Sequence, residues 1–326
     1  MRQLTLLFIL SVSACSYKKP QSETLRGDYF GLTASDTMSL FAADIVSTEF
    51  QELNAAFSPE GDIFMWTIAD PMRTYYTIMQ YQRNDDVWEG PQIASFSGKY
   101  SDADPIFSPD GKRVYFISKR PIQDGLEEKP DFDIWYVERN GFDWSEPVHM
   151  GAPINSELNE YYVSVTSDGT LVYSSSYEGG FGGNDIYFAT PTDDGYQVSN
   201  AGEAINSQFS EGDPYISADG NMLIFSAWGR PDSLGSGDLY ISYKKDGQWS
   251  QAQNMGPQFN STANEYCPIV SPDGAYFFLT SYRAPTFVSP QEPMSYEQYS
   301  NRLKGLNNGM GNVYWVNSKT LEQFKQ

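Results

Sequence analysis

The sequence predicts an all-β protein, a β-propeller of five four-stranded blades closed by a strand from the N-terminal end. Two observations predict this fold. A turn ending in an acidic residue and glycine recurs along the chain, and an alternating apolar segment follows each turn; the glycines are Gly61, Gly111, Gly169, Gly220 and Gly274. A period of about 50 residues suits a unit of four strands. Six blades is the alternative, if residues 27–50 and the C-terminal end form more structure than we assign to them.

The first two strands of each unit flank the recurring turn. In the second unit, residues 105–107 run into Ser108-Pro109-Asp110-Gly111, where proline presets φ and glycine accepts positive φ, so the chain reverses. The second strand follows, and its aromatic and β-branched residues favour a pleated sheet. The five second strands are expected at residues 63–67, 114–118, 171–175, 222–226 and 276–280.

The third and fourth strands complete each unit. A small polar residue opens the third strand at Asp133, Asn184, Gly237 and Gly311, whereas the first unit offers only residues 76–79. After the third strand of the last unit only residues 317–326 remain. Residues 40–47 resemble the fourth-strand pattern and have no blade of their own. We therefore expect them to complete the last blade, which removes an open sheet edge.

The N-terminal segment predicts export and lipidation. Arg2 precedes an apolar run over residues 4–10 that is too short to span a bilayer, and residues 12–15 resemble the lipobox that precedes an acylated cysteine. The alternative is an ordinary signal peptide with an incidental cysteine. We divide the chain into a signal at 1–14, lipidated Cys15 with a tether to residue 27, and a single propeller over 28–326. Acylation of Cys15 leaves Cys267 without a disulfide partner.

Composition excludes several functions. The formal net charge of −21 argues against nucleic-acid binding. One histidine and two cysteines leave no cluster for zinc, and no Gly-x-Ser-x-Gly elbow of a serine hydrolase occurs. We expect no cofactor, apart from a divalent cation at the acidic positions described below.

The repeated Pro-x-Phe-Ser-Pro-Asp-Gly, the Phe-x-Ser strand and the Asp-Ile-Tyr strand resemble the TolB-type, WD-like propeller repeat of bacterial envelope proteins. The resemblance covers residues 40–316. It implies a propeller fold and an envelope location. It does not imply one activity, because related propellers serve as interaction modules, as parts of peptidoglycan-associated proteins and as gating domains of peptidases.

Five acidic residues occupy equivalent positions near the start of the first strands, which predicts a ring of carboxylates at the tunnel mouth. They are Glu52, Asp102, Glu160, Glu211 and Glu265. Such a ring is able to bind a divalent cation or a cationic ligand. The structural alternative is pairing with Arg120, Arg230 and Arg283, which follow the second strands on the same face. Two residues further on, Asp104, Tyr162, Asp213 and Cys267 differ from blade to blade, which argues against a symmetric metal ring.

The loops between second and third strands carry the other candidates. Tyr177, Phe181 and Trp228 lie on glycine-rich loops, where they suit stacking on sugars or peptides; packing at the blade edges is the alternative. Residues 284–308 form an insertion in the last blade, with a short helix expected over 296–306 that would lie over the tunnel.

We therefore expect a monomeric lipoprotein, anchored in the bacterial envelope and most simply in the outer membrane, whose propeller binds an envelope protein or glycan. Ser16, directly after the lipidated cysteine, favours the outer membrane by analogy with proteobacterial sorting. The alternative function is a glycoside hydrolase that uses two or three of the tunnel-mouth carboxylates as acid and base or nucleophile.

Overall fold

The computed structural model describes residues 24–123, 125–284, 289–306 and 308–325. The predicted signal, Cys15 and most of the predicted tether lie outside the described residues. Within the described ranges, no helix is both long enough and apolar enough to cross a membrane.

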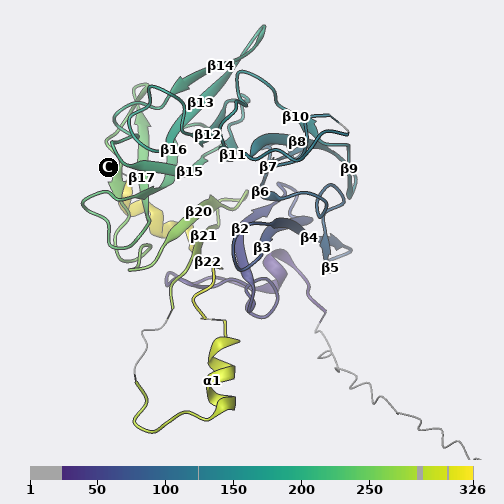
Figure 1. Ribbon diagram of the computed structural model, residues 1–326, viewed down its shortest axis with the longest axis vertical. Helices are drawn as coiled ribbons and strands as arrows, with labels where there is room; N and C mark the ends of the chain where they lie inside the picture. The colour runs from purple at the N-terminus through teal and green to yellow at the C-terminus, as the bar shows by residue number, and fades with distance from the viewer. Residues whose placement is uncertain (1–23, 124, 285–288, 307, 326) are drawn as a thin grey trace, which may run out of the picture.

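The strands of the described residues form five antiparallel sheets arranged as blades around a central axis (Figure 1). This confirms the predicted five-bladed propeller. Blade 1 contains β2 (Gln51–Phe57), β3 (Ile63–Ala69), β4 (Tyr76–Asn84) and β5 (Val87–Ile93). Blade 2 contains β6 (Asp102–Phe107), β7 (Arg113–Ser118), β8 (Asp133–Asn140), β9 (Asp143–Trp144) and β10 (Val148–His149). Blade 3 contains β11 (Glu160–Val165), β12 (Leu171–Ser175), β13 (Asp185–Thr192) and β14 (Gly195–Asn200).

The last two blades follow the same plan. Blade 4 contains β15 (Ser210–Ile216), β16 (Met222–Trp228), β17 (Asp238–Lys245), β18 (Gln248–Trp249) and β19 (Gln253–Asn254). Blade 5 contains β20 (Glu265–Val270), β21 (Tyr276–Ser281), β22 (Asn312–Asn317) and β1 (Ser39–Leu40). The first strand of each blade is the innermost, and all five expected second strands are present.

The N-terminal strand closes the ring, as predicted, but it is shorter than expected. β1 pairs with β22 through Ser39 and Leu40 only. The backbone then leaves the extended conformation, since Ala42 has a φ of 44°. Phe41 is fully buried, and its ring packs against those of Phe278 and Trp315 at centroid distances of 5.1 and 5.0 Å. Closure therefore depends as much on aromatic packing as on strand pairing.

A β-bulge interrupts every innermost strand at the same position. The pairing register shifts there in all five blades, and the residue at the bulge has a φ between 44° and 60°. These residues are Asn54, Asp104, Tyr162, Asp213 and Cys267. A bulge re-aims a side chain that strict alternation would place elsewhere. Aspartate and asparagine accept this backbone conformation with little strain, whereas tyrosine and cysteine do not.

The five predicted ring acids join neighbouring blades. All five are fully buried. In the joint between blades 3 and 4, the Ser207 hydroxyl and backbone N–H donate to Glu211 at 2.5 and 3.0 Å. The preceding Asn206 donates to and accepts from the backbone of Ile186, in the third strand of blade 3. The same Asn-Ser-x-x-x-Glu arrangement recurs with Asn155 and Glu160, and with Asn260 and Glu265.

Arginines reinforce three of these joints. Arg120, Arg230 and Arg283 pair with Asp102, Glu211 and Glu265 at 2.7, 2.8 and 3.4 Å. Each guanidinium also donates to a backbone carbonyl of the segment that leaves the preceding blade, at Phe96, Ile205 and Phe259 respectively. These three arginines therefore pair with ring acids, as in the structural alternative given in the sequence analysis.

We predict that Arg230→Ala lowers the free energy of unfolding by about 3 to 5 kcal/mol, because it leaves the buried Glu211 carboxylate without its cation. Urea unfolding measures this loss. The matched control is Arg113→Ala, whose guanidinium pairs with Glu138 where both side chains are substantially exposed; this change should cost less than about 1 kcal/mol. Equal losses in the two variants would contradict a special role for the joints.

Candidate functional site

A pocket of about 730 Å³ lies where the innermost strands of the blades meet. Its lining includes Arg73, Asp104, Lys119, Tyr161, Asp213 and Tyr266. These residues come from four innermost strands or from segments that follow a second strand. A volume in this range suits a small ligand that is largely enclosed.

Two carboxylates at bulge positions face this pocket. Asp104 is 7% exposed, and Asp213 is partly buried. Both lie against Cys267 of blade 5: its backbone N–H donates to Asp213 at 3.4 Å, and its Sγ lies 3.8 Å from Asp104. The two acids, which belong to blades 2 and 4, therefore approach one another across the axis.

Burial raises the pKa values of both carboxyls, by different amounts. Desolvation, followed by the charge of Asp213, raises the pKa of Asp104 to about 8. Desolvation also raises the pKa of Asp213 to about 6, against the opposing effects of the Cys267 N–H and the Arg73 charge. At neutral pH the pair therefore holds about one proton. A coupled pair of this kind is typical of functional sites.

The joint acids provide an internal comparison. Asp102, two residues before Asp104, accepts from Ser97 at 2.9 Å, from Ser118 at 2.6 Å and from Arg120 at 2.7 Å. Among the described residues, the Asp104 carboxylate has only the long thiol contact, and Asp213 has only one long backbone N–H contact. The same strand thus carries one acid saturated with donors and one that retains most of its acceptor capacity toward the pocket.

The residue before each bulge shapes the pocket wall. Ala103 and Gly212 precede the two aspartates, whereas Tyr161 and Tyr266 occupy the equivalent positions in blades 3 and 5. Small residues therefore stand beside the acids, with the Trp228 ring packed against Gly212, and tyrosine rings occupy the equivalent positions in blades 3 and 5. A Cβ at Gly212 would lie 3.1 Å from the Trp228 ring.

One buried hydroxyl on this wall has no partner. Ser174 is 1% exposed and lines the pocket, and its Oγ makes no hydrogen bond among the described residues. A buried polar atom without a partner is costly unless a ligand or water satisfies it. Ser174 therefore adds a second kind of unused hydrogen-bonding capacity to the pocket.

The predicted ring acids do not line this pocket. Segments such as 155–159 fold back over them, and every one accepts a backbone N–H or an arginine N–H. Among the described residues, no arginine lies within 4 Å of the Glu52 or Glu160 carboxylate, and desolvation raises the pKa of each to about 7. Within the described residues, no group of three or more His, Cys, Asp or Glu side chains is arranged to hold a metal ion.

The three predicted loop aromatics have different positions. Trp228 lines the pocket, and its indole N–H donates to Asn264 at 2.7 Å. Tyr177 occupies the place that arginine has in other joints, since its hydroxyl donates to the carbonyl of Ile154 at 2.5 Å. Phe181 is 49% exposed and is not a lining residue. Its loop is held in place: a Cβ at Gly182 would lie 1.9 Å from the carbonyl oxygen of Phe209.

The predicted insertion contains the expected helix, but this helix does not lie over the tunnel as expected. Helix α1 (Tyr296–Leu303) begins with a capping box formed by Ser295 and Gln298. It extends away from the blades (Figure 1), so it does not cover the central pocket. Tyr296, Tyr299 and Leu303 on this helix are exposed.

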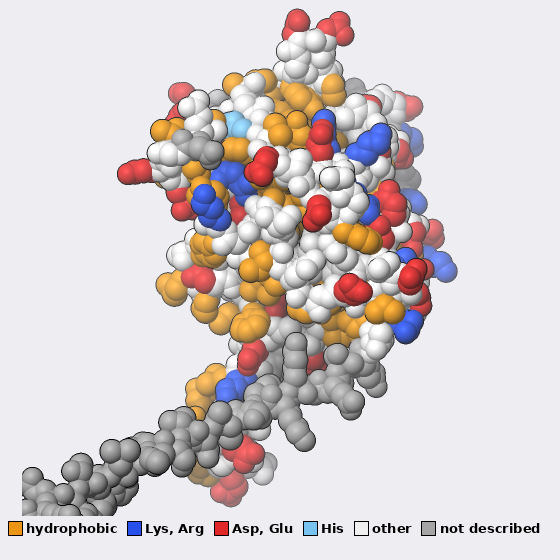
Figure 2. All heavy atoms as spheres, turned by 90° about the vertical axis from the view of Figure 1, so that its right-hand side faces the viewer, with side chains coloured by type: hydrophobic (Ala, Val, Ile, Leu, Met, Phe, Trp, Pro, Cys, Tyr) orange, Lys and Arg blue, Asp and Glu red, His pale blue; other side chains and the backbone are white. Residues whose placement is uncertain are grey.

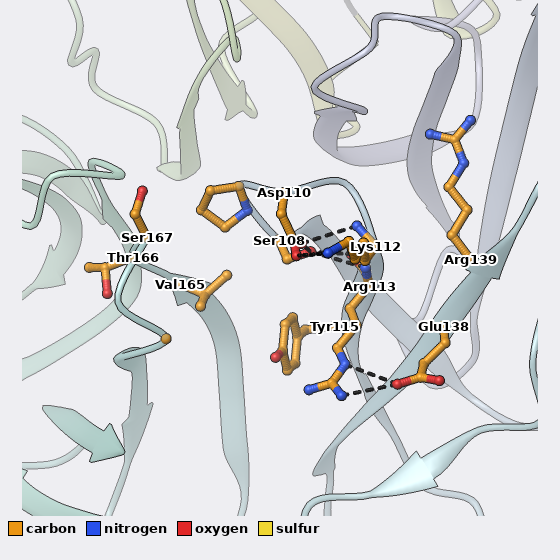
Figure 3. A pocket seen from close by; sticks show the side chains of 12 residues that line it. Ser108, Asp110, Lys112, Arg113, Tyr115, Glu138, Arg139, Val165, Thr166 and Ser167 are labelled. Atoms are coloured by element: carbon orange, nitrogen blue, oxygen red, sulfur yellow. Dashed lines mark hydrogen bonds and ion pairs between the residues drawn. The ribbon is translucent and has the colours of Figure 1, made fainter. Parts of the chain in front are cut away.

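A second cavity, of about 560 Å³, lies between blades 2 and 3 beside the Ser108–Gly111 turn (Figure 3). Its charged groups are already compensated. Arg113 pairs with Glu138, Lys112 with Asp110, and Arg139 with Glu60 and Asp62. Figure 2 shows the same mixing of charges on one side of the molecule, where basic side chains lie between acidic ones. We therefore place the candidate site in the central pocket.

Asp104 and Asp213 were named in the sequence analysis but were assigned no binding role. Their departure from the repeat could have indicated such a role, because two acids occupy a position where other blades have Asn54, Tyr162 or Cys267. Arg73 was missed, since it lies further along the loop after its second strand than Arg120, Arg230 and Arg283 do and makes no equivalent ion pair.

Comparison with known proteins supports the fold and no more. No protein-family model and no curated protein matches the sequence. Among solved structures, a glycoside hydrolase has a TM-score of 0.54 at 11% identity, covering 87% of this chain and 91% of its own. An α-L-arabinofuranosidase from Lactobacillus brevis has a TM-score of 0.51 at 12% identity, with 88% and 94% covered. A TolB protein from Agrobacterium tumefaciens has a TM-score of 0.48 at 16% identity, with 82% and 90% covered. The chain is similar in fold to the two structures with TM-scores above 0.5.

We predict that Asp104→Asn stabilises the protein, and by several kcal/mol more at pH 8 than at pH 5, because each pH unit between the unfolded and folded pKa values costs the wild type about 1.4 kcal/mol. The pKa of the Asp104 carboxyl is about 8 in the folded protein and near the ordinary aspartate value of 3.8 in the unfolded chain. Its contribution is therefore fully favourable below that lower value and is lost as pH rises toward 8. Thermal unfolding at both pH values measures the difference.

The control is Asp102→Asn, in the same strand. This change removes a charged partner from Arg120 and should destabilise the protein at both pH values. A variant at position 104 that is less stable than the wild type at pH 8 would contradict a weakly bonded carboxylate in the pocket.

Proposed function

We propose that this protein is a glycan-binding propeller of the bacterial envelope, held at the membrane by a lipid on Cys15, which takes a sugar into its central pocket. The observation that carries the proposal is the contrast between Asp102 and Asp104. The first carboxylate is saturated by protein donors, and the second is left with acceptor capacity that faces a pocket.

Sugar chemistry fits the remaining lining. Hydroxyl groups donate to carboxylates and accept from them when the carboxyl is protonated, and a pair that holds about one proton offers both modes. The apolar faces of sugar rings pack against aromatic side chains, and the partly exposed rings of Tyr161 and Trp228 supply such surfaces. Asn159, Asn184 and Asn264 add amide groups around the rim.

A glycoside hydrolase is the second candidate, now with different residues from those first expected. Two carboxyls in one pocket with pKa values of about 8 and about 6 are suited to the roles of general acid and base. The five joint acids are not suited to these roles, because they are buried and occupied by protein donors. Under this hypothesis Asp104 is the acid, and Asp213 is the base or nucleophile.

Isothermal titration of oligosaccharides prepared from bacterial envelope polysaccharides tests binding. Trp228→Ala should weaken affinity by roughly tenfold or more, because it removes an aromatic wall of the pocket. Phe181→Ala is the matched control, since this exposed ring lies outside the pocket and its removal should leave affinity unchanged. Equal effects of the two variants would contradict binding in the central pocket.

The hydrolase is tested by a reducing-end assay. Release of new reducing ends by the wild type, and loss of this release in Asp104→Asn, would favour the hydrolase.

The anchor is tested separately. When the full-length gene is expressed in its native host, the protein should incorporate labelled palmitate, and Cys15→Ser should abolish the label because no thiol remains at the predicted lipobox. Cys267→Ser is the control and should retain it. Secretion of an unlabelled wild-type protein would contradict lipidation.

A further inference from the structure

Arg73 is a cation held at the pocket without a carboxylate partner. Within the described residues, no carboxylate oxygen lies within 4 Å of its guanidinium, although acidic residues outnumber basic ones by 42 to 21. For Lys119, the other basic residue of the pocket lining, the described residues likewise provide no carboxylate within 4 Å.

The loop that carries Arg73 is fixed by one side chain. The Asp70 carboxylate accepts the backbone N–H groups of Thr74 and Tyr75 at 2.5 and 2.9 Å, and the Asp70 carbonyl accepts the Arg73 N–H at 2.9 Å. This turn holds Arg73 at a φ of 56°, in a backbone region that arginine seldom adopts. Strained residues of this kind often occur at functional sites.

Aromatic rings hold the guanidinium itself. Its Cζ lies 5.7 Å from the ring centroids of both Tyr266 and Tyr282, two rings of blade 5 that stack 5.6 Å apart. Arg73 therefore reaches from blade 1 to blade 5 along the pocket. The Arg73 guanidinium also interacts with the Tyr76 hydroxyl. A guanidinium has five N–H donors, so the contacts with the rings and with one hydroxyl leave others for an acceptor.

The charge balance of the pocket favours an anion. Arg73 and Lys119 contribute two positive charges, and the aspartate pair contributes about one negative charge at neutral pH, because one of its two protons is retained. A ligand that carries a carboxylate is thus attracted to Arg73, and the single negative charge on the Asp104–Asp213 pair does not outweigh this attraction. Arginine also binds a carboxylate through two parallel N–H bonds, which gives directional recognition.

Building on the proposed function, we propose that the pocket selects an acidic sugar, a uronic acid whose carboxylate binds Arg73 while its ring hydroxyls bind Asp104 and Asp213. Lys119 adds positive charge without fixing the geometry. Arg73 is then the specificity-determining residue, and the aspartate pair contributes to binding of acidic and neutral sugars alike.

The test compares oligomers of galacturonate, glucuronate and mannuronate with their carboxyl-reduced counterparts, which have the same length and linkage and differ only in lacking the charge. Isothermal titration with the full chain should show one uronate series binding roughly tenfold or more tighter than its reduced counterpart. Arg73→Gln should remove this difference by weakening binding of the uronate series, with a much smaller effect on binding of the reduced oligomer. Arg113→Gln, a surface arginine outside the central pocket, should behave as the wild type. Equal melting temperatures establish that the variants are folded.

The outcomes separate the two proposals. Binding of the reduced oligomers with equal or greater affinity overturns selection of an acidic sugar and leaves the glycan-binding function in place. A preference for uronates that persists in Arg73→Gln overturns the role of Arg73. Failure of every oligomer to bind, acidic and neutral, overturns the glycan-binding function together with this inference.

Discussion

The buried acid at the start of each innermost strand is the interaction on which the ring depends. The backbone N–H groups of Glu52, Glu160, Glu211 and Glu265 each donate to a carbonyl directly before or at the edge of the preceding blade's third strand, at 2.8 to 2.9 Å. Their carboxylates accept from the segment that leaves the same blade. One residue per blade therefore ties two blades together through both backbone and side chain. Because its carboxylate is fully buried, the attraction is strong only while every donor is present.

Because these joints hold the blades together, the residues nearest the central axis are able to differ from blade to blade. The acid at the start of the strand makes the repeated joint contacts, whereas the bulge residue two positions later makes contacts that differ from blade to blade, such as Asn54 with Pro105 and Tyr162 with Pro268. Asn54, Asp104, Tyr162, Asp213 and Cys267 show this freedom, since no two adjacent blades have the same residue there. The pocket thus differs chemically on each side while the scaffold around it repeats. In a propeller of this kind, the repeat specifies the fold, and departures from the repeat indicate the site.

The sequence predicted the fold well because the fold depends on the repeated residues. The turns, the second strands and the ring closure all follow from local patterns that recur in each blade. The site was less predictable for two physical reasons. Alternation in a strand cannot reveal a bulge, so Glu52 and its counterparts were expected at the tunnel mouth and Asp104 was not. Arg73 reaches blade 5 from a loop of blade 1, and such a contact between distant segments leaves no local signal.

The five joints are unequal, and this inequality bears on the pocket. Arginine supports the joints between blades 1 and 2, 3 and 4, and 4 and 5. Glu52 and Glu160, in the remaining two joints, have pKa values raised to about 7 by desolvation. Their contributions to stability are lost as pH rises from their ordinary values toward 7, in the same direction as that of Asp104. The two joints without arginine divide the ring into blades 1 and 2 on one side and blades 3 to 5 on the other. Asp104 belongs to the first group and Asp213 to the second, so a ligand bound to both carboxylates spans the division and links the two groups of blades through the pocket.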